Sequence, residues 1–200
     1  MPAVAPAPPR PEAAPPGLAQ PLRWTRERYD RAVEAGVLTD EDKVELLDGE
    51  VVTKMTQNSA HRTSTLLVSA ALRAAFGTGA FVQEEKPVAL SDQSEPEPDV
   101  AVVQGAVRDY VADHPGPSAL VLVVEVADTS LRRDRTVKAA LYAEAGIAEY
   151  WVVDLQGGRL EIYRDPADGS YRTKATHERG GEVSRVHAPG ASVAVADLLP

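Results

Sequence analysis

The sequence predicts an α/β (α+β) fold in which a mixed β-sheet is flanked by helices. Residues 120–126 and 149–153 are almost continuously apolar, which is typical of strands buried on both faces. A helical pattern over residues 131–145 lies between them, and such a unit favours a parallel strand pair with a right-handed crossover. The alternating residues 159–164, which follow a Gly-Gly turn, predict an antiparallel neighbour.

The chain begins with a proline- and alanine-rich segment, residues 1–21, that is expected to be disordered. Its eight prolines interrupt helices and central strands, and it has little apolar bulk to bury. Residues 22–200 are enough for a single domain with a substantial core. The hydrophobic content of 44% and charged content of 26% are ordinary for a globular protein.

Local signals define the elements before the first buried strand. Thr25 is a favoured N-cap residue and predicts a helix to about residue 35. The dipeptide Asp48-Gly49 predicts a hairpin over residues 44–54. A helix should then run from residue 58 or 59 to Phe76. Its apolar stripe is expected to comprise Leu66, Leu67, Ala70, Ala71, Ala74 and Ala75. Further strands are predicted at residues 81–90, 100–103, 171–176 and 183–187.

Composition excludes several classes of site. The chain has no cysteine, which excludes disulfides and Cys-ligated zinc and is compatible with a reducing cytoplasm. It has no apolar run of transmembrane length and no apolar signal core at its N-terminus, so no membrane association is expected. The net charge of −9 disfavours broad, nonspecific nucleic-acid binding, although a local basic face remains compatible with it.

Two carboxylates at strand ends are the strongest candidates for a functional site. Asp99 enters a strand after Pro98, and Glu125 lies near the end of the buried run 120–126. Buried charges are normally paired or bound to a metal, and two carboxylates from adjacent strands can supply hard oxygen ligands for Mg²⁺. The alternatives are a strand-entry role for Asp99 and a structural ion pair between Glu125 and a basic residue of the next helix.

The order of these residues resembles the PD-(D/E)XK nuclease superfamily. Pro98-Asp99, then Glu125, then a helix carrying Lys138 is most similar to its bacterial putative restriction endonuclease-like family. Other segments of the resemblance are residues 44–52, His61, residues 97–100 and residues 145–154. It covers roughly residues 24 to 165 and implies a restriction endonuclease-like sheet, a Mg²⁺ or Mn²⁺ cofactor and cleavage of phosphodiester bonds.

The chain departs from the superfamily pattern at one position. The Glu-x-Lys element would place lysine at position 127, where this chain has alanine. Lys138 on the following helix is the nearest lysine downstream, and the resemblance implies that it orients the attacking water. The alternative is an ordinary surface pair with Asp134, four residues earlier. Glu45 is implied as a supporting acid of the metal site, the alternative being an exposed strand residue.

Four basic residues are candidates for nucleic-acid contact. Arg132, Arg133 and Arg135 lie in the first turns of a helix, where the helix dipole disfavours cations, so a need for charge there would explain them. Internal ion pairing explains them equally well. His61 lies near a helix N-terminus, where it could touch a phosphate, hold a site carboxylate or simply pack.

The expected function is therefore metal-dependent endonuclease hydrolysis of nucleic acid, with DNA the favoured substrate. Asp99 and Glu125 would hold the metal, the Val126 carbonyl would add a ligand, Lys138 would position water and Glu45 would support the site. One alternative is a catalytically inactive nuclease fold that serves as a binding or regulatory module, which Ala127 and the acidic charge favour. Another is an RNA-directed nuclease. Related nucleases that cut two strands often dimerise, so a homodimer is compatible.

Overall fold

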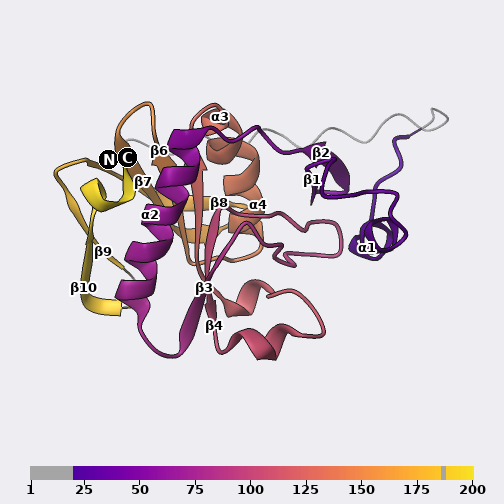
Figure 1. Cartoon of the computed structure of the whole chain (residues 1–200), viewed down its shortest axis with the longest axis horizontal. Helices are drawn as coiled ribbons and strands as arrows, with labels where there is room; N and C mark the ends of the chain where they lie inside the picture. The colour runs from indigo at the N-terminus through magenta and orange to yellow at the C-terminus, as the bar shows by residue number, and fades with distance from the viewer. Residues whose placement is uncertain (1–19, 186–187) are drawn as a thin grey trace.

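The centre of the molecule is a six-stranded mixed sheet (Figure 1). The structure, a computed structural model, describes residues 20–185 and 188–200. The order β3-β4-β5-β6-β7-β8 is made by β3 (Ala80–Glu84), β4 (Val100–Gln104), β5 (Leu120–Ala127), β6 (Glu149–Asp154), β7 (Arg159–Ala167) and β8 (Ser170–Glu178). The β5–β6 pair is parallel, as predicted, and the other four pairs are antiparallel.

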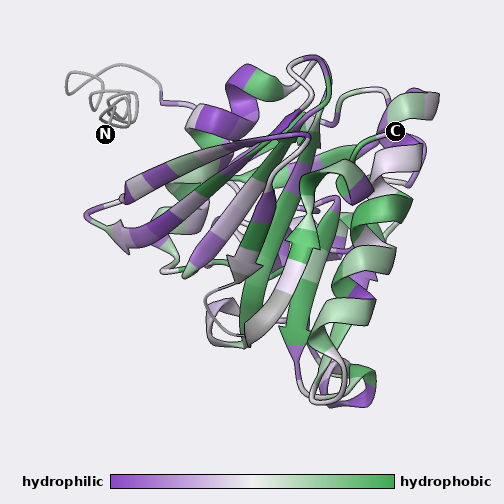
Figure 2. Ribbon diagram, turned by 90° about the vertical axis from the view of Figure 1, so that its left-hand side faces the viewer, coloured by the Kyte–Doolittle hydropathy of each residue, from purple (hydrophilic) through white to green (hydrophobic). Residues whose placement is uncertain are grey.

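Helices cover both faces of this sheet, which is why its central strands are apolar on both sides. Helix α2 (Ser59–Phe76) packs on one face, together with the C-terminal segment. The other face is covered by a continuous helical segment made of α3 (Leu131–Arg133), a π-helical turn (Asp134–Lys138) and α4 (Ala139–Glu144). Figure 2 shows the green, hydrophobic central strands that lie between these layers. The two hydrophobic clusters alternate along β5, as the period of a strand requires.

The predicted apolar stripe of α2 is confirmed only in part: Ala71 and Ala75 pack against the core, but the centre of the buried face is rotated away from the predicted one. Val68 and Leu72 are fully buried against the sheet, whereas Leu66 is 52% exposed. The helix ends and its Asn58 N-cap agree with the sequence, since the Asn58 side chain accepts a hydrogen bond from the His61 N–H. The misleading signal was the number of alanines, because small polar residues occupy the buried face instead. These are Ser64, Thr65 and Ser69.

The N-terminal elements form a separate layer beside the sheet. Helix α1 (Arg26–Glu34) is capped by Thr25, and β1 (Val44–Leu47) pairs with β2 (Glu50–Thr53) in a two-stranded sheet of its own. Asp48 and Gly49 have φ angles of 47° and 75°, so this turn has the two positive φ values that the dipeptide predicted. The helix and the hairpin are both confirmed.

Two predicted strands have different limits. The strand predicted at residues 81–90 ends at Glu84, because Glu85 takes a positive φ of 50° before Pro87 is reached. The strand predicted at residues 183–187 is β9 (Glu182–Arg185), and its partner β10 (Ala188–Ala194) was not predicted. Of the predicted tail, only residues 20 and 21 lie within the described part of the chain. The end of the predicted segment 183–187 also lies outside it.

Short helical turns complete the chain. They are η1 (Val107–Tyr110), η2 (Pro117–Ala119) and η4 (Val195–Leu198). In the described part of the chain, no helix combines the length and the apolar character needed to cross a membrane.

Candidate functional site

The start of β4 and the end of β5 bring Asp99 and Glu125 to one face of the sheet. Because β4 and β5 are antiparallel, with Val100 opposite Val124, these two ends meet. Alternate residues of each strand belong to the cluster beneath α4, and the same alternation places both carboxylates on that face. Asp99 and Glu125 are 9% and 3% exposed, so each carboxylate requires a partner.

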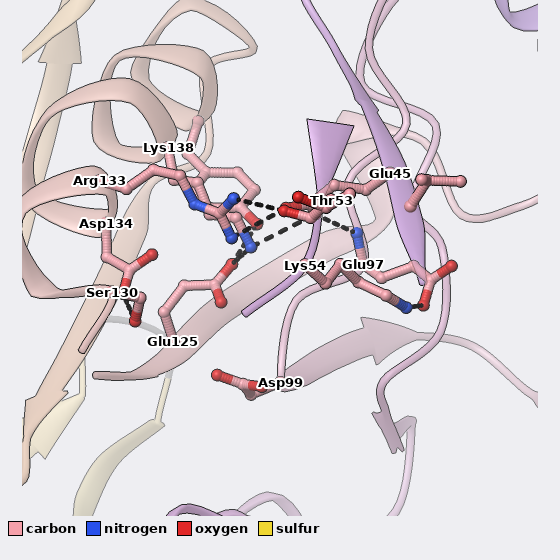
Figure 3. Close-up of polar contacts among 12 residues, drawn as sticks. Glu45, Thr53, Lys54, Glu97, Asp99, Glu125, Ser130, Arg133, Asp134 and Lys138 are labelled. Carbon is pink, nitrogen blue, oxygen red and sulfur yellow. Dashed lines mark hydrogen bonds and ion pairs between the residues drawn. The ribbon is translucent and has the colours of Figure 1, made fainter. Parts of the chain in front are cut away.

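One oxygen of Glu125 is held by two buried donors. Lys138 Nζ lies 2.8 Å from Glu125 Oε1, and the Tyr142 hydroxyl donates to the same atom at 2.7 Å. Figure 3 shows the second carboxylate oxygen of Glu125 turned away from Lys138 and toward Asp99. Lys138 is 4% exposed, so the alternative of a surface pair with Asp134 is wrong. The ion pair between Glu125 and a helical lysine is present.

The charges within this cluster are strongly coupled. Burial raises the pKa of Glu125 well above its usual value, and the negative charges of Asp99, Asp134 and Glu45 add to the effect, while Lys138 opposes it. Burial disfavours the charged form of Lys138, but the surrounding carboxylates, Glu125 foremost, outweigh it and raise the lysine pKa. The lysine is therefore a fixed cation that offsets part of a concentrated negative charge.

Asp99 is held by the backbone of β5 and by α2. Its Oδ2 accepts the Val126 N–H at 2.7 Å and lies 3.3 Å from His61 Nε2. Burial lowers the pKa of His61, but the hydrogen bond and the charge of Asp99 outweigh burial, and the net shift is upward. Of the three roles considered for His61, the structure therefore displays contact with a site carboxylate.

Pro98 explains why the Val126 carbonyl receives no ladder hydrogen bond from the residue opposite it. Continuing the β4–β5 register by two residues places Pro98 opposite Val126, and proline has no N–H for the ladder. The Ala127 carbonyl points the other way and accepts the Leu155 N–H at 2.9 Å. Successive residues of a strand point in opposite directions, so the Val126 carbonyl lies on the Asp99 side. The missing proline N–H thus leaves the Val126 carbonyl without a donor from residue 98, while the Val126 N–H donates to Asp99.

Glu45 reaches the site from the β1–β2 hairpin and is fully buried, so the exposed-strand alternative is wrong. Its Oε2 accepts the Glu97 N–H at 3.2 Å and lies 3.4 Å from Lys138 Nζ. Arg133 contacts the other oxygen at 3.3 Å and donates to the Thr53 carbonyl at 3.1 Å. Lys138 and Arg133 therefore tie the hairpin to the helix across the site.

The arginines of the helix have three different environments. Arg132 is exposed. Arg133 faces Glu45, as described above. Arg135 donates two hydrogen bonds to Glu161, at 2.9 and 2.6 Å, and lies 3.2 Å from Asp154, so internal pairing accounts for it. The structure therefore groups His61 with Asp99 and Arg133 with Glu45 in the site. Arg135 pairs with Glu161 and Asp154 instead.

Sequence reasoning missed two polar residues of the site. Asp134 is 2% exposed, accepts the Ser130 hydroxyl at 2.5 Å and has a pKa raised by burial to about 6. Tyr142 contacts Glu125, as described above. Both are four residues from Lys138, one on each side, so helical spacing from the lysine is the signal that could have found them.

The cluster lines a small pocket of about 60 Å³. Its wall includes Glu45, His61, Asp99, Glu125, Arg133, Asp134 and Lys138. A wider cavity of about 830 Å³ adjoins it and shares Lys54, Met55, Gln57, Glu85 and Glu97 with it. The buried carboxylates therefore lie at the end of an open groove formed by α1, the hairpin and the segment after β3. A larger reactant could extend into this groove while one of its groups enters the small pocket.

The donor set of this pocket is of the kind that hard cations prefer. Carboxylate oxygens of Asp99 and Glu125 and a backbone carbonyl are ligands that Mg²⁺ and Mn²⁺ accept. Within residues 20–185 and 188–200, no group of three or more His, Cys, Asp or Glu side chains is already arranged to hold a metal ion. The residues fit a site in which two carboxylates and the carbonyl supply the protein ligands and water fills the remaining positions.

One comparison with known proteins shows the family of the chain, and another shows its fold. The profile of the Uma2 family, described as "Putative restriction endonuclease", matches residues 26–196. A crystal structure described as a putative nuclease belonging to DUF820, from Anabaena variabilis ATCC 29413, is similar with a TM-score of 0.65. The alignment covers 87% of this chain and 96% of that one at 13% identity, so it shows the shared fold alone. No curated protein matches the chain.

Proposed function

The chain belongs to the Uma2 family of restriction endonuclease-like proteins, and we propose that it is a divalent-metal-dependent endonuclease that hydrolyses phosphodiester bonds in DNA. One observation carries the proposal. Asp99 and Glu125, 26 residues apart in the sequence, share one buried pocket with Lys138 Nζ, which lies 2.8 Å from Glu125. A carboxylate pair with an adjacent lysine is suited to phosphoryl chemistry, because it provides ligands for a cation and a fixed positive charge.

Asp99, Glu125 and the Val126 carbonyl would hold Mg²⁺ or Mn²⁺. When bound, such an ion lowers the pKa of water and stabilises negative charge on a phosphate. The protein's own contribution is positioning. Val126 N–H and His61 hold Asp99, and Lys138 holds Glu125, so neither carboxylate has to be ordered when nucleic acid arrives.

Lys138 would have two tasks in the reaction. In the structure its ammonium lies between Glu125 and Glu45, at 2.8 and 3.4 Å. With a cation held by Asp99 and Glu125, the Lys138 ammonium would be able to donate to the attacking water or to a phosphate oxygen as well as to Glu125. Because the lysine pKa is raised, Lys138 would act as a hydrogen-bond donor rather than as a base. Glu45, 3.4 Å from Lys138 Nζ, would keep the ammonium beside the pocket.

A second function is favoured by the same contacts. Lys138 and Arg133 already neutralise Glu125 and Glu45 without a metal, and the chain carries a net charge of −9. A protein with such an internally paired site could serve as a non-catalytic binding or regulatory module on a nuclease fold. The two functions differ in whether Asp99 and Glu125 bind a divalent cation.

Cleavage of supercoiled plasmid, single-stranded DNA and RNA with Mg²⁺ or Mn²⁺ tests the proposal. The wild type should nick or linearise DNA, and Asp99→Asn and Glu125→Gln should each abolish cleavage while remaining folded. Glu161→Gln is a matched control, because Glu161 is a buried carboxylate of the same sheet that does not line the pocket. If the protein cleaves only the RNA, RNA takes the place of DNA as the proposed substrate. Wild-type inactivity on all three, without Mn²⁺ binding, would refute the proposal in favour of the module.

A further inference from the structure

We propose that Tyr142 is a positioning residue that makes Glu125 a one-oxygen metal ligand. The inference rests on the proposed metal site and adds a residue to it. Tyr142 is fully buried on α4, and its hydroxyl donates to Glu125 Oε1 at 2.7 Å. Lys138 Nζ donates to the same oxygen at 2.8 Å. Two donors from one helix therefore converge on one oxygen of a carboxylate that has two.

The helix brings these donors together through its own period. Lys138 and Tyr142 are four residues apart and so lie on the same helical face, which packs on the Glu125 side of the sheet. The π-helical turn Asp134–Lys138 ends at the lysine, and π-turns within helices occur frequently at functional sites. The Tyr142 ring packs against Tyr150 at a centroid distance of 4.9 Å, so the hydroxyl has a fixed direction.

Saturation of Oε1 determines how Glu125 can bind a cation. A carboxylate offers about four lone-pair positions on its two oxygens, and two donors occupy those of Oε1. The other oxygen is the one that Figure 3 shows turned toward Asp99. A divalent ion between Asp99 and Glu125 would therefore meet one oxygen of Glu125. If Lys138 moves toward the substrate, Tyr142 alone keeps this orientation.

Tyr142 is suited to this task because its hydroxyl carries a proton that it donates to the Glu125 carboxylate. The alternative is that a buried tyrosine hydroxyl merely needs an acceptor. Tyr171 displays that alternative within the same aromatic cluster, because its buried hydroxyl donates to the Ile147 carbonyl at 2.8 Å, away from the pocket. Tyr171→Phe is therefore a matched control for Tyr142→Phe.

Calorimetric titration of the metal-free, full-length protein with Mn²⁺, without nucleic acid and well below the melting temperature, tests the inference. Tyr142→Phe should weaken Mn²⁺ binding by roughly 10- to 100-fold, as expected when a group that orients a metal ligand is removed. Tyr171→Phe should leave the affinity within about twofold of wild type. In cleavage assays with saturating Mn²⁺, Tyr142→Phe should lower kcat without raising KM for DNA, because the hydroxyl touches Glu125 and not the substrate.

Other outcomes separate this inference from the proposed function. Equal Mn²⁺ affinity for wild type and Tyr142→Phe, with binding lost in Glu125→Gln, would overturn the role of Tyr142 and leave the metal site intact. Absence of Mn²⁺ binding by the wild type would overturn both. Mn²⁺-soaked crystals of the wild type give a test that needs no variant. A single Glu125 oxygen on the metal, with the Tyr142 hydroxyl on the other, is expected, and two oxygens on the metal would refute the inference.

Discussion

Replacing Glu125 by glutamine separates a metal ligand from a structural ion pair. Glutamine keeps the shape of the side chain, and its amide oxygen can still accept from Lys138 and Tyr142. Its amino group would then face Asp99 as a donor. Lys138 retains Glu45 at 3.4 Å, so the substitution does not leave a buried cation without a partner. The metal-free mutant should therefore be about as stable as the wild type.

The sign of the small remaining change follows from the pKa of Glu125. The pKa of Glu125 is higher in the folded state than in the unfolded chain. This carboxyl therefore lowers the free energy of unfolding at every pH above its pKa in the unfolded chain, and the neutral amide removes that effect. We expect the metal-free melting temperature to be equal or higher, within about 4 °C, since roughly 1 kcal/mol corresponds to about 2–4 °C at this chain length. Stranding Lys138 would instead cost about 3–5 kcal/mol and lower the melting temperature by roughly 6–20 °C.

The response to Mn²⁺ completes the experiment. At 100 times Kd, a bound ion stabilises the native state by about 2.7 kcal/mol, which should raise the wild-type melting temperature by roughly 5–11 °C and leave Glu125→Gln unchanged. Glu161→Gln should behave in the opposite way. The pKa of Glu161 is lowered, because its hydrogen bonds to Arg135, Lys174 and Tyr163 outweigh burial, so this variant should lose stability and keep the Mn²⁺ response. A Glu125→Gln protein that melts much lower and retains the full Mn²⁺ response would refute the reasoning.

Three further predictions concern the rest of the molecule. Leu72→Ala should cost about 2–5 kcal/mol and Leu66→Ala less than about 0.5 kcal/mol in urea unfolding, and equal losses would contradict the buried face of α2. Arg132→Gln should reduce the salt dependence of DNA binding at unchanged stability, and an unaltered salt slope would exclude Arg132 from the interface. Arg135→Gln should instead lower the free energy of unfolding by about 1–3 kcal/mol. Burial outweighs the nearby Arg26 and raises the pKa of Glu95 to about 7, so the free energy of unfolding should fall by up to about 3 kcal/mol as pH rises from about 4.5 through 7. Glu95→Gln should flatten this loss, and an identical pH profile for the mutant would show that Glu95 does not cause it.

The sequence predicts what depends on local pattern and misses what depends on packing partners. The buried strands β5 and β6, the Asp48-Gly49 hairpin and the Asn58 cap all follow from periodicity or turn chemistry, and the structure has them. The α2 face could not be predicted from apolar counts. A serine that donates to a backbone carbonyl, as Ser64 does to Leu198, is buried at no loss of hydrogen bonding.

The same division applies to the candidate site. Asp99 and Glu125 stand out in the sequence because a charge beside a buried strand is unusual. Lys138 was identified by resemblance, and its burial beside Glu125 depends on how the helix crosses β5. The sequence signal for Tyr142 and Asp134 is only their four-residue spacing from Lys138, because tyrosine and aspartate are ordinary residues in an amphipathic helix. Only the three-dimensional contacts with Glu125 and Ser130 distinguish them.

The separate two-stranded sheet has a consequence for how the protein opens. A two-stranded hairpin is marginally stable alone, so β1–β2 persists through its attachments, among them the Arg133 contact with Thr53, 80 residues away in sequence. Such an element should exchange its amide hydrogens through local opening, while β5 and β6 exchange only on global unfolding. The wall of the pocket that β1–β2 forms should therefore open and close faster than the sheet that carries Asp99 and Glu125 unfolds and refolds. During folding, the long-range closure that completes this wall should be among the last contacts to form.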